Sequence, residues 1–138
     1  MYILSLLLII SIISCKTIGD VKREKDEGIV NIYPVPLDQA WKIALTVFHW
    51  QGADSVEEHR EEGYMLSNSE FDSNKAGTLV KAWIEPVDEN NTKVTIVTKE
   101  KLSTNMLTRL AELTFHKRFA QAVNIIKAGN PLPTISPD

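Results

Sequence analysis

The stretch that decides the fold is residues 78–100, TLVKAWIEPVDENNTKVTIVTKE, in which two β-prone runs flank a short polar turn. Apolar side chains stand at every second position of both runs: Val80, Ala82, Ile84, Val94 and Ile96. This alternation is typical of strands that bury one face, and the turn at residues 88–91 has the length of a hairpin loop. The sequence therefore predicts an antiparallel hairpin of strands 78–87 and 92–100.

Three further β-prone runs precede this hairpin. Residues 55–59 and 64–71 are separated by the turn Glu61-Glu62-Gly63, and a turn-rich segment then leads into the central hairpin. Separators of this length favour antiparallel pairing of consecutive strands. Residues 29–33, IVNIY, form another short run that stops before Pro34. Pro86 is expected at a strand end or a sheet edge, because proline cannot donate to the ladder.

Apolar spacing of three and four residues predicts two helices. The first begins near Leu37 and ends before Gly52, with Asp38 in its first turn, where a carboxylate favours the helix dipole. The second spans residues 104–128, and its buried stripe is Leu107, Ala111, Phe115, Phe119, Ala122 and Ile126. The order is then β-α-β-β-β-β-α. This order predicts an α+β two-layer sandwich, with two helices on one face of an antiparallel sheet of four to five strands.

Composition excludes several classes of protein. The chain has 138 residues and one cysteine, so an internal disulfide and a zinc site built from several cysteines are excluded. Its 15 basic and 18 acidic residues give a net charge of −3, and a pI near 5.6 argues against a general nucleic-acid binder. With 43% hydrophobic and 24% charged residues, the composition is that of a globular domain.

The N-terminal residues 1–14, MYILSLLLIISIIS, are apolar and contain no charged side chain. This run is shorter than the roughly 20 residues of a membrane-spanning helix and has the length of a signal-peptide core. It ends in Ile12-Ile13-Ser14-Cys15, which resembles the bacterial lipobox. The resemblance implies cleavage before Cys15, diacylglycerol on its thiol and acylation of its new amino group. The other interpretations are a buried N-terminal element with an ordinary cysteine, or a secreted protein cleaved without acylation.

The rest of the chain divides into three parts. Residues 15–28 are highly charged and nearly devoid of apolar side chains after Ile18, which predicts a solvated tether, and the lipobox resemblance implies that this tether is lipidated at Cys15. Residues 29–128 are expected to form a single domain. Residues 129–138 contain three prolines and are expected to be an irregular tail. In Gram-negative lipoproteins, a residue such as Lys16 after the cysteine implies the outer membrane.

A second resemblance concerns the domain itself. The segment YPVPLDQAW (residues 33–41) and the predicted element order resemble small envelope lipoprotein domains. Among these are the domains of the lipoprotein C subunit of the outer-membrane β-barrel assembly machinery. The resemblance is one of element layout and of this single motif, and it implies a small α+β domain of the cell envelope.

Catalytic signatures are absent from the sequence. It contains neither a glycine-rich phosphate loop nor the nucleophile and zinc motifs of common hydrolases. His49, His59 and His116 lack the pairwise spacing of metal ligands. We therefore expect a protein that is not an enzyme and that needs no metal or cofactor.

Both helices have apolar residues outside their main stripes. Ile43 and Trp50 lie opposite Trp41 on the first helix, whereas Met106, Leu110 and Leu113 lie opposite the stripe of the second. A helix that is apolar on two sides is either buried twice or contacts a partner. We predict a partner surface, to which three cations of the second helix would add steering: Arg109, Lys117 and Arg118. The alternative is that the tether, the tail or a wide sheet covers these residues.

These observations together predict a membrane-anchored envelope lipoprotein, held in the bilayer by acylated Cys15 and located in the outer membrane. It would bind another protein or support an envelope assembly, and it would not bind nucleic acid. The alternative is a carrier that holds a small apolar ligand between the sheet and the last helix. The cleft of such a carrier would be lined by five aromatic residues: Trp41, Phe48, Trp83, Phe115 and Phe119.

Overall fold

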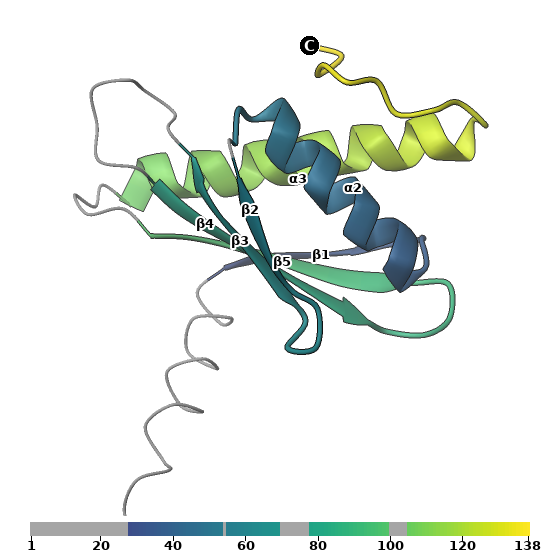
Figure 1. The fold of residues 1–138 in the computed structure, drawn as a ribbon, viewed down its shortest axis with the longest axis horizontal. Helices are drawn as coiled ribbons and strands as arrows, with labels where there is room; N and C mark the ends of the chain where they lie inside the picture. Colours follow the sequence, from purple (N-terminus) through teal and green to yellow (C-terminus); the bar gives the residue numbers. More distant parts are fainter. Residues whose placement is uncertain (1–27, 54, 70–77, 100–104) are drawn as a thin grey trace, which may run out of the picture.

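The computed structural model describes residues 28–53, 55–69, 78–99 and 105–138, and Figure 1 shows their arrangement. These residues form five strands and two helices in the order β-α-β-β-β-β-α, which confirms the predicted α+β fold. The elements are β1 (Ile29–Tyr33), α2 (Leu37–Trp50), β2 (Val56–His59), β3 (Tyr64–Ser69), β4 (Thr78–Pro86), β5 (Thr92–Lys99) and α3 (Asn105–Lys127).

The five strands form one antiparallel sheet in the order β1-β5-β4-β3-β2. The predicted hairpin β4–β5 supplies two of its three inner strands, and Pro86 stands at the end of β4, as expected. The first strand of the domain pairs with the last, with Ile29 opposite Ile96. The sheet therefore has β1 at one edge and β2 at the other.

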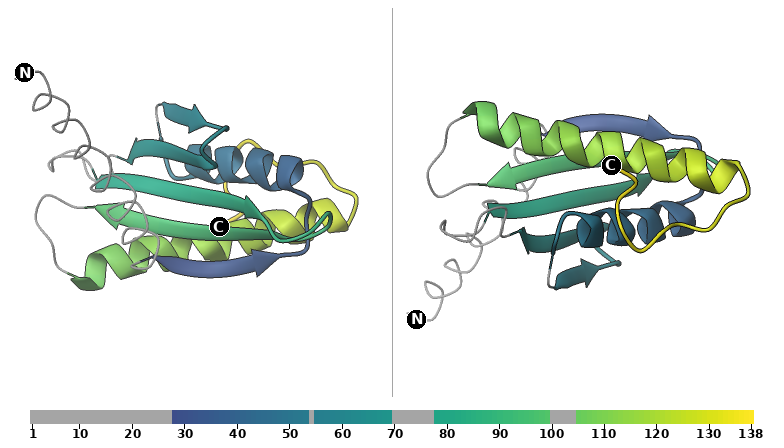
Figure 2. Two further views of the ribbon diagram at one scale, coloured as in Figure 1. Left: turned by 90° about the horizontal axis from the view of Figure 1, so that it is seen from below. Right: turned by 90° about the horizontal axis from the view of Figure 1, so that it is seen from above.

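Both helices lie on the same face of the sheet (Figure 2). The inward side chains of β4, Val80, Ala82 and Ile84, are at most 2% exposed because they face these helices. Phe48 of α2 and Phe115 of α3 meet edge to face, with 5.0 Å between ring centroids. Such contacts fill the space between the two layers, so the core is a packed aromatic and aliphatic layer.

Two glycines fix the ends of elements. Gly52 has φ of +80°, which lets the chain leave α2 in the left-handed conformation expected of a helix stop. Gly28 lies against β5, where an added Cβ would be 2.6 Å from the carbonyl oxygen of Ile96. The start of the domain is therefore fixed by close backbone packing onto the last strand. Neither α2 nor α3 combines the length and apolar character that crossing a membrane requires.

Candidate functional site

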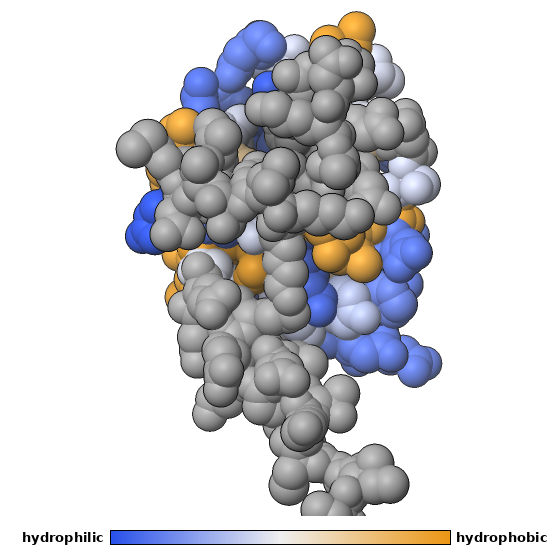
Figure 3. All heavy atoms as spheres, turned by 90° about the vertical axis from the view of Figure 1, so that its left-hand side faces the viewer, coloured by the Kyte–Doolittle hydropathy of each residue, from blue (hydrophilic) through white to orange (hydrophobic). Residues whose placement is uncertain are grey.

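The outward side of α3 presents the apolar residues that the sequence placed there. Leu110 and Leu113 are 54% and 52% exposed, and the neighbouring Arg109 and Lys117 are also exposed. On the face of the molecule shown in Figure 3, hydrophobic side chains reach the surface between hydrophilic ones. The described part of α3 therefore has a mixed apolar and cationic outer side.

Two residues of the predicted partner surface are instead part of the core. Ile43 is 0% exposed and Trp50 is 9% exposed, so the prediction that they belong to a partner surface is wrong. The reason is that α2 contacts both β4 and α3, which bury more than one side of the helix. The C-terminal segment also covers Trp50. The Trp50 Nε1 donates a hydrogen bond to the Pro133 carbonyl of this segment at 2.9 Å.

The structure does not describe the side chains of two further predicted site residues, Cys15 and Met106. Cys15, the lipobox residues before it and nearly all of the expected tether precede Gly28. Met106 lies in the first turn of α3, where the structure does not describe side chains. Their predicted roles in lipidation and partner binding remain predictions.

Two of the three predicted cations make contacts within the molecule. Lys117 Nζ lies 3.2 Å from Asp138 Oδ2, and Arg118 Nη1 donates to the backbone carbonyl of Trp50 at 3.2 Å. Gln121 also donates to Asp138, at 2.7 Å. The hydrogen bonds from Gln121 and Lys117 hold the pKa of the Asp138 carboxyl below its ordinary value. The contacts of Lys117 and Gln121 attach the C-terminal segment to α3, and that of Arg118 joins α3 to the end of α2.

Between the inner side of α3 and strand β1 lies a polar group of residues that sequence reasoning missed. We call it the edge cluster, and it consists of Tyr33 of β1 and of Glu112 and His116 of α3. Glu112 accepts hydrogen bonds from the Thr98 backbone N–H and hydroxyl, each at 3.1 Å, and from the Ile29 backbone. His116 Nε2 donates to the Ile29 carbonyl at 2.8 Å, because a carbonyl can only accept. The cluster thus satisfies the outward-facing backbone groups at the start of edge strand β1.

Burial shifts the pKa values of two side chains of the edge cluster, Glu112 and His116. Glu112 is 6% exposed, and its burial raises the pKa of its carboxyl, against the opposing effect of the hydrogen bonds from Thr98. His116 is 4% exposed, and its burial lowers the pKa of the imidazole. In the neutral ring, Nδ1 accepts from the Tyr33 hydroxyl at 2.7 Å. Both ring nitrogens are therefore engaged in contacts that hold α3 against β1.

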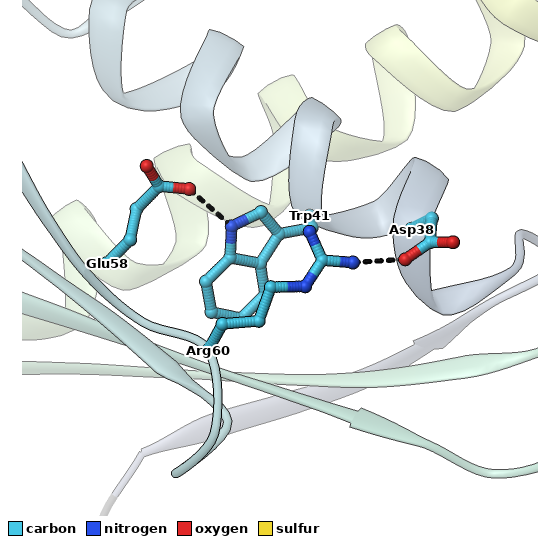
Figure 4. Close-up of polar contacts among 4 residues, drawn as sticks. All are labelled: Asp38, Trp41, Glu58 and Arg60. Carbon is cyan, nitrogen blue, oxygen red and sulfur yellow. Dashed lines mark hydrogen bonds and ion pairs between the residues drawn. The ribbon is translucent and has the colours of Figure 1, made fainter.

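A second polar group joins α2 to the β2 edge of the sheet (Figure 4). Trp41 Nε1 donates to Glu58 Oε1 at 2.6 Å, and the Arg60 guanidinium lies 5.2 Å from the centroid of the Trp41 ring. Arg60 also pairs with Asp38 in the first turn of α2. The exposed charges of this region are arranged around a buried tryptophan, so they hold the hairpin β2–β3 against the helix.

Aromatic side chains also gather on the face of the sheet away from the helices. The His59 and Tyr64 rings stack with 4.5 Å between centroids, and those of Tyr64 and Trp83 lie 4.9 Å apart. Lys81 Nζ is 4.2 Å from the centroid of Tyr64 and 4.7 Å from that of Trp83. This group is held together by stacking and cation–π contacts.

The position of Trp83 corrects the predicted lining of the carrier cleft. Strand alternation puts its ring on the opposite face from Ala82 and Ile84, which face the helices. The other four residues named for this cleft lie in the core between the layers, at most 2% exposed: Trp41, Phe48, Phe115 and Phe119. The five residues therefore do not line one common cleft.

The histidines lie on three separate elements. His49 is exposed on α2, His59 lies at the end of β2, and His116 is buried on α3. Within residues 28–53, 55–69, 78–99 and 105–138, no three side chains of the histidine, cysteine, aspartate and glutamate types come close enough to hold a metal ion.

No family model matches this sequence, and no curated protein matches it. Among solved structures, the chain is similar to one described as a conserved protein from Geobacillus kaustophilus, with 10% sequence identity and a TM-score of 0.40. The similarity covers 72% of this chain and 93% of that chain. A similarity at this level gives no information on function.

Proposed function

We propose that this chain is a lipid-anchored lipoprotein of the bacterial cell envelope. Its folded domain binds another protein. The anchor is supported by the uncharged apolar run that ends in Ile12-Ile13-Ser14-Cys15. Two or more acyl chains suffice for stable anchoring, because each buried methylene contributes about 0.8 kcal/mol. Residue 16 is lysine, which supports placement in the outer membrane.

The observation that carries the binding role is the exposure of Leu110 and Leu113 on α3, at 54% and 52%. Fully burying a leucine side chain contributes about 1.5–3 kcal/mol, before the costs of association are subtracted. These two leucines follow one another on the same side of the helix at a spacing of three residues. They can therefore enter one contact surface together.

The charges around these leucines favour a partner with an acidic surface. Glu112 is the sole acidic residue of α3, and it is buried in the edge cluster. The exposed cations of α3 next to the leucines are Arg109 and Lys117, and Lys117 is paired with the exposed carboxylate of Asp138, so among the described residues Arg109 carries most of the unpaired positive charge. Charges at the rim of an interface act mainly on the association rate and its salt dependence.

A binding role is also favoured over catalysis by the use of the polar side chains. His116 and Glu112 hold β1, and Glu58 accepts the hydrogen bond of Trp41. A general base needs a lone pair that can reach a substrate proton. Both ring nitrogens of His116, and one carboxylate oxygen each of Glu112 and Glu58, are occupied by other groups of the protein.

The binding role is tested by the double substitution Leu110→Ser with Leu113→Ser in the full chain. We expect the melting temperature to stay within a few degrees of the wild type, while affinity capture from the native envelope loses a specific partner. The matched control is Val87→Ser, since Val87 is 52% exposed on the β4–β5 turn. Equal capture by the double variant and the wild type would contradict the proposal.

The anchor is tested by intact-mass measurement of the protein from its native host. We expect a mature N-terminus at Cys15 whose mass includes a diacylglycerol and a further acyl chain. Cys15→Ser should leave an uncleaved precursor or release the protein from membranes. An unmodified Cys15 in the native protein would contradict the lipoprotein assignment and would leave the binding role to be judged by the α3 variants.

A further inference from the structure

The C-terminal segment after α3 follows a definite path over the helix layer. We call residues 130–138, NPLPTISPD, the tail. After the helix ends at Lys127, Gly129 has φ of +83° and the Asn130 N–H donates to the Ile125 carbonyl. From there the tail crosses toward α2 and returns to α3, as seen on the helix side of the molecule (Figure 2). It forms no strand or helix of its own.

Three side chains hold the tail, and we call them the tail seat: Trp50, Lys117 and Gln121. The Trp50 indole N–H donates to the Pro133 carbonyl at 2.9 Å, beside Leu132, which packs against the core. Lys117 and Gln121 bind the two carboxylate oxygens of Asp138, at 3.2 Å and 2.7 Å. The tail is therefore held near its start by an aromatic donor and at its end by a cation and an amide.

The chemistry of the tail seat is that of peptide recognition. Extended proline-containing segments commonly bind surfaces lined by aromatic side chains, because proline restricts the backbone before binding. Pro131 and Pro133 flank Leu132 in the tail, and the contact to Trp50 is made through a backbone carbonyl. A backbone carbonyl and a carboxylate are features that a segment of another protein can present equally well.

The contact between the tail and its seat leaves some buried polar atoms without hydrogen bonds in the described part of the chain. Gln121 Oε1 and Ser136 Oγ are buried, and neither has a hydrogen-bond partner among the described residues. The ion pair of Lys117 with Asp138 is exposed to solvent, with side chains 68% and 43% accessible, and exposed pairs contribute little stability. Ile135 is 78% exposed and adds little buried surface. An occupant that hydrogen-bonds the amide of Gln121 more fully would compete with the tail.

We propose that the tail seat is a binding site for an extended, proline-containing segment of a partner protein that places a carboxylate five residues after the bound carbonyl. The tail is the intramolecular occupant of this site and competes with the partner segment. The site shares Lys117 with the rim of the leucine surface but includes neither Leu110 nor Leu113, so it does not depend on the role of these leucines. Binding of the partner would release residues 130–138 from the helix layer.

The test uses a fluorescent peptide with the sequence of the tail and the full chain in detergent micelles. In the full chain, the attached tail competes at a high effective concentration. The variant Leu132→Ser with Asp138→Asn weakens the attached tail but leaves the seat intact. We expect this variant to bind the peptide at least about tenfold more tightly than the wild type. The control Ile135→Ser, which changes an exposed tail residue, should bind the peptide as the wild type does.

Two further variants keep the outcome interpretable. Asp138→Asn alone changes an exposed residue, so it should keep the fold and show a smaller gain in peptide binding. Adding Trp50→Phe to either variant removes the indole donor while keeping a buried ring, and it should weaken peptide binding by about 2–10-fold. A peptide with Asn in place of its final Asp should also bind more weakly.

Two results would overturn the proposal. If folded variants with a weakened tail bind no peptide up to about 1 mM, the tail contacts are part of the fixed fold and no exchangeable site exists. If the wild type is a dimer that the free peptide dissociates, the seat is occupied by the tail of a second copy and not by a partner protein.

Discussion

The two helices share a sequence pattern and differ in their surroundings. Both have apolar residues outside their main stripe: Ile43 and Trp50 on α2, Leu110 and Leu113 on α3. On α2 both residues are buried, whereas the two leucines of α3 are more than half exposed. The same pattern therefore produces core on one helix and surface on the other.

The difference follows from what packs against each helix. α2 contacts β4 and α3. The tail also covers Trp50, the last residue of α2, and accepts the hydrogen bond of its indole at Pro133. α3 contacts β1, β5 and α2, and those contacts leave Leu110 and Leu113 outward. A helical wheel shows which residues share a side of a helix, but it does not show how many sides are covered.

Among the substitutions that test this comparison, the largest loss of stability is expected at Ile43. Ile43→Ser should lower the free energy of unfolding by about 3–5 kcal/mol, because it removes buried methylenes and places a hydroxyl in the apolar core. Ile43→Val, the matched control, should cost about 0.5–1.5 kcal/mol. Chemical denaturation of both variants measures the effect. A cost below about 1 kcal/mol for Ile43→Ser would mean that α2 has an accessible second side, as α3 does.

Sequence reasoning predicted the elements well because their periodic patterns are long. The alternation of Val80, Ala82 and Ile84 and the spacing of Phe115 and Phe119 placed each residue in the core between the sheet and the helices, as the structure confirms. The coverage of Ile43 could not be predicted, since it depends on how α2 and α3 pack in three dimensions. The position of Trp83, in contrast, could be predicted from the sequence. Trp83 alternates with Ala82 along the strand, which places it on the outer face of β4.

The edge cluster gives the second largest expected effect. Glu112→Ala should cost about 1–3 kcal/mol, because it leaves the Thr98 and Ile29 backbone groups without their acceptor in a buried place. Asn124→Ala, at an exposed position of the same helix, is the control and should have little effect. A value for Glu112→Ala equal to that of the control would show that β1 does not need α3 to complete its edge.

A sequence signal for this cluster existed. Glu112 and His116 are four residues apart and fall beside Phe115 and Phe119 on the buried stripe of α3. Ionisable residues on a buried stripe need partners, but the partner groups are backbone atoms of β1 and β5. Backbone partners leave no trace in side-chain patterns, so the sequence marks the cluster without identifying what it binds.

A pH dependence should distinguish the inner side of α3 from its outer side. Burial lowers the pKa of His116 in the folded state, so between that value and the unfolded value of about 6.5 the unfolded chain binds more protons. Stability from this residue is therefore present above pH 6.5 and lost as the pH falls. His116→Gln should show a smaller loss of stability between pH 7.5 and 5.5 than the wild type. A loss of the same size in both proteins would assign the pH dependence to other groups.

The smallest effect is expected at Leu113, and it tests the comparison of the two helices most directly. Leu113→Ser changes an apolar residue to the same polar one as Ile43→Ser, but at a side chain that is 52% exposed. Surface changes of this kind usually alter stability by less than about 0.5 kcal/mol. Denaturation of the full chain at two protein concentrations measures both stability and self-association. A concentration-independent cost above about 2 kcal/mol would show that the outward side of α3 is covered within one molecule, and α3 would then resemble α2.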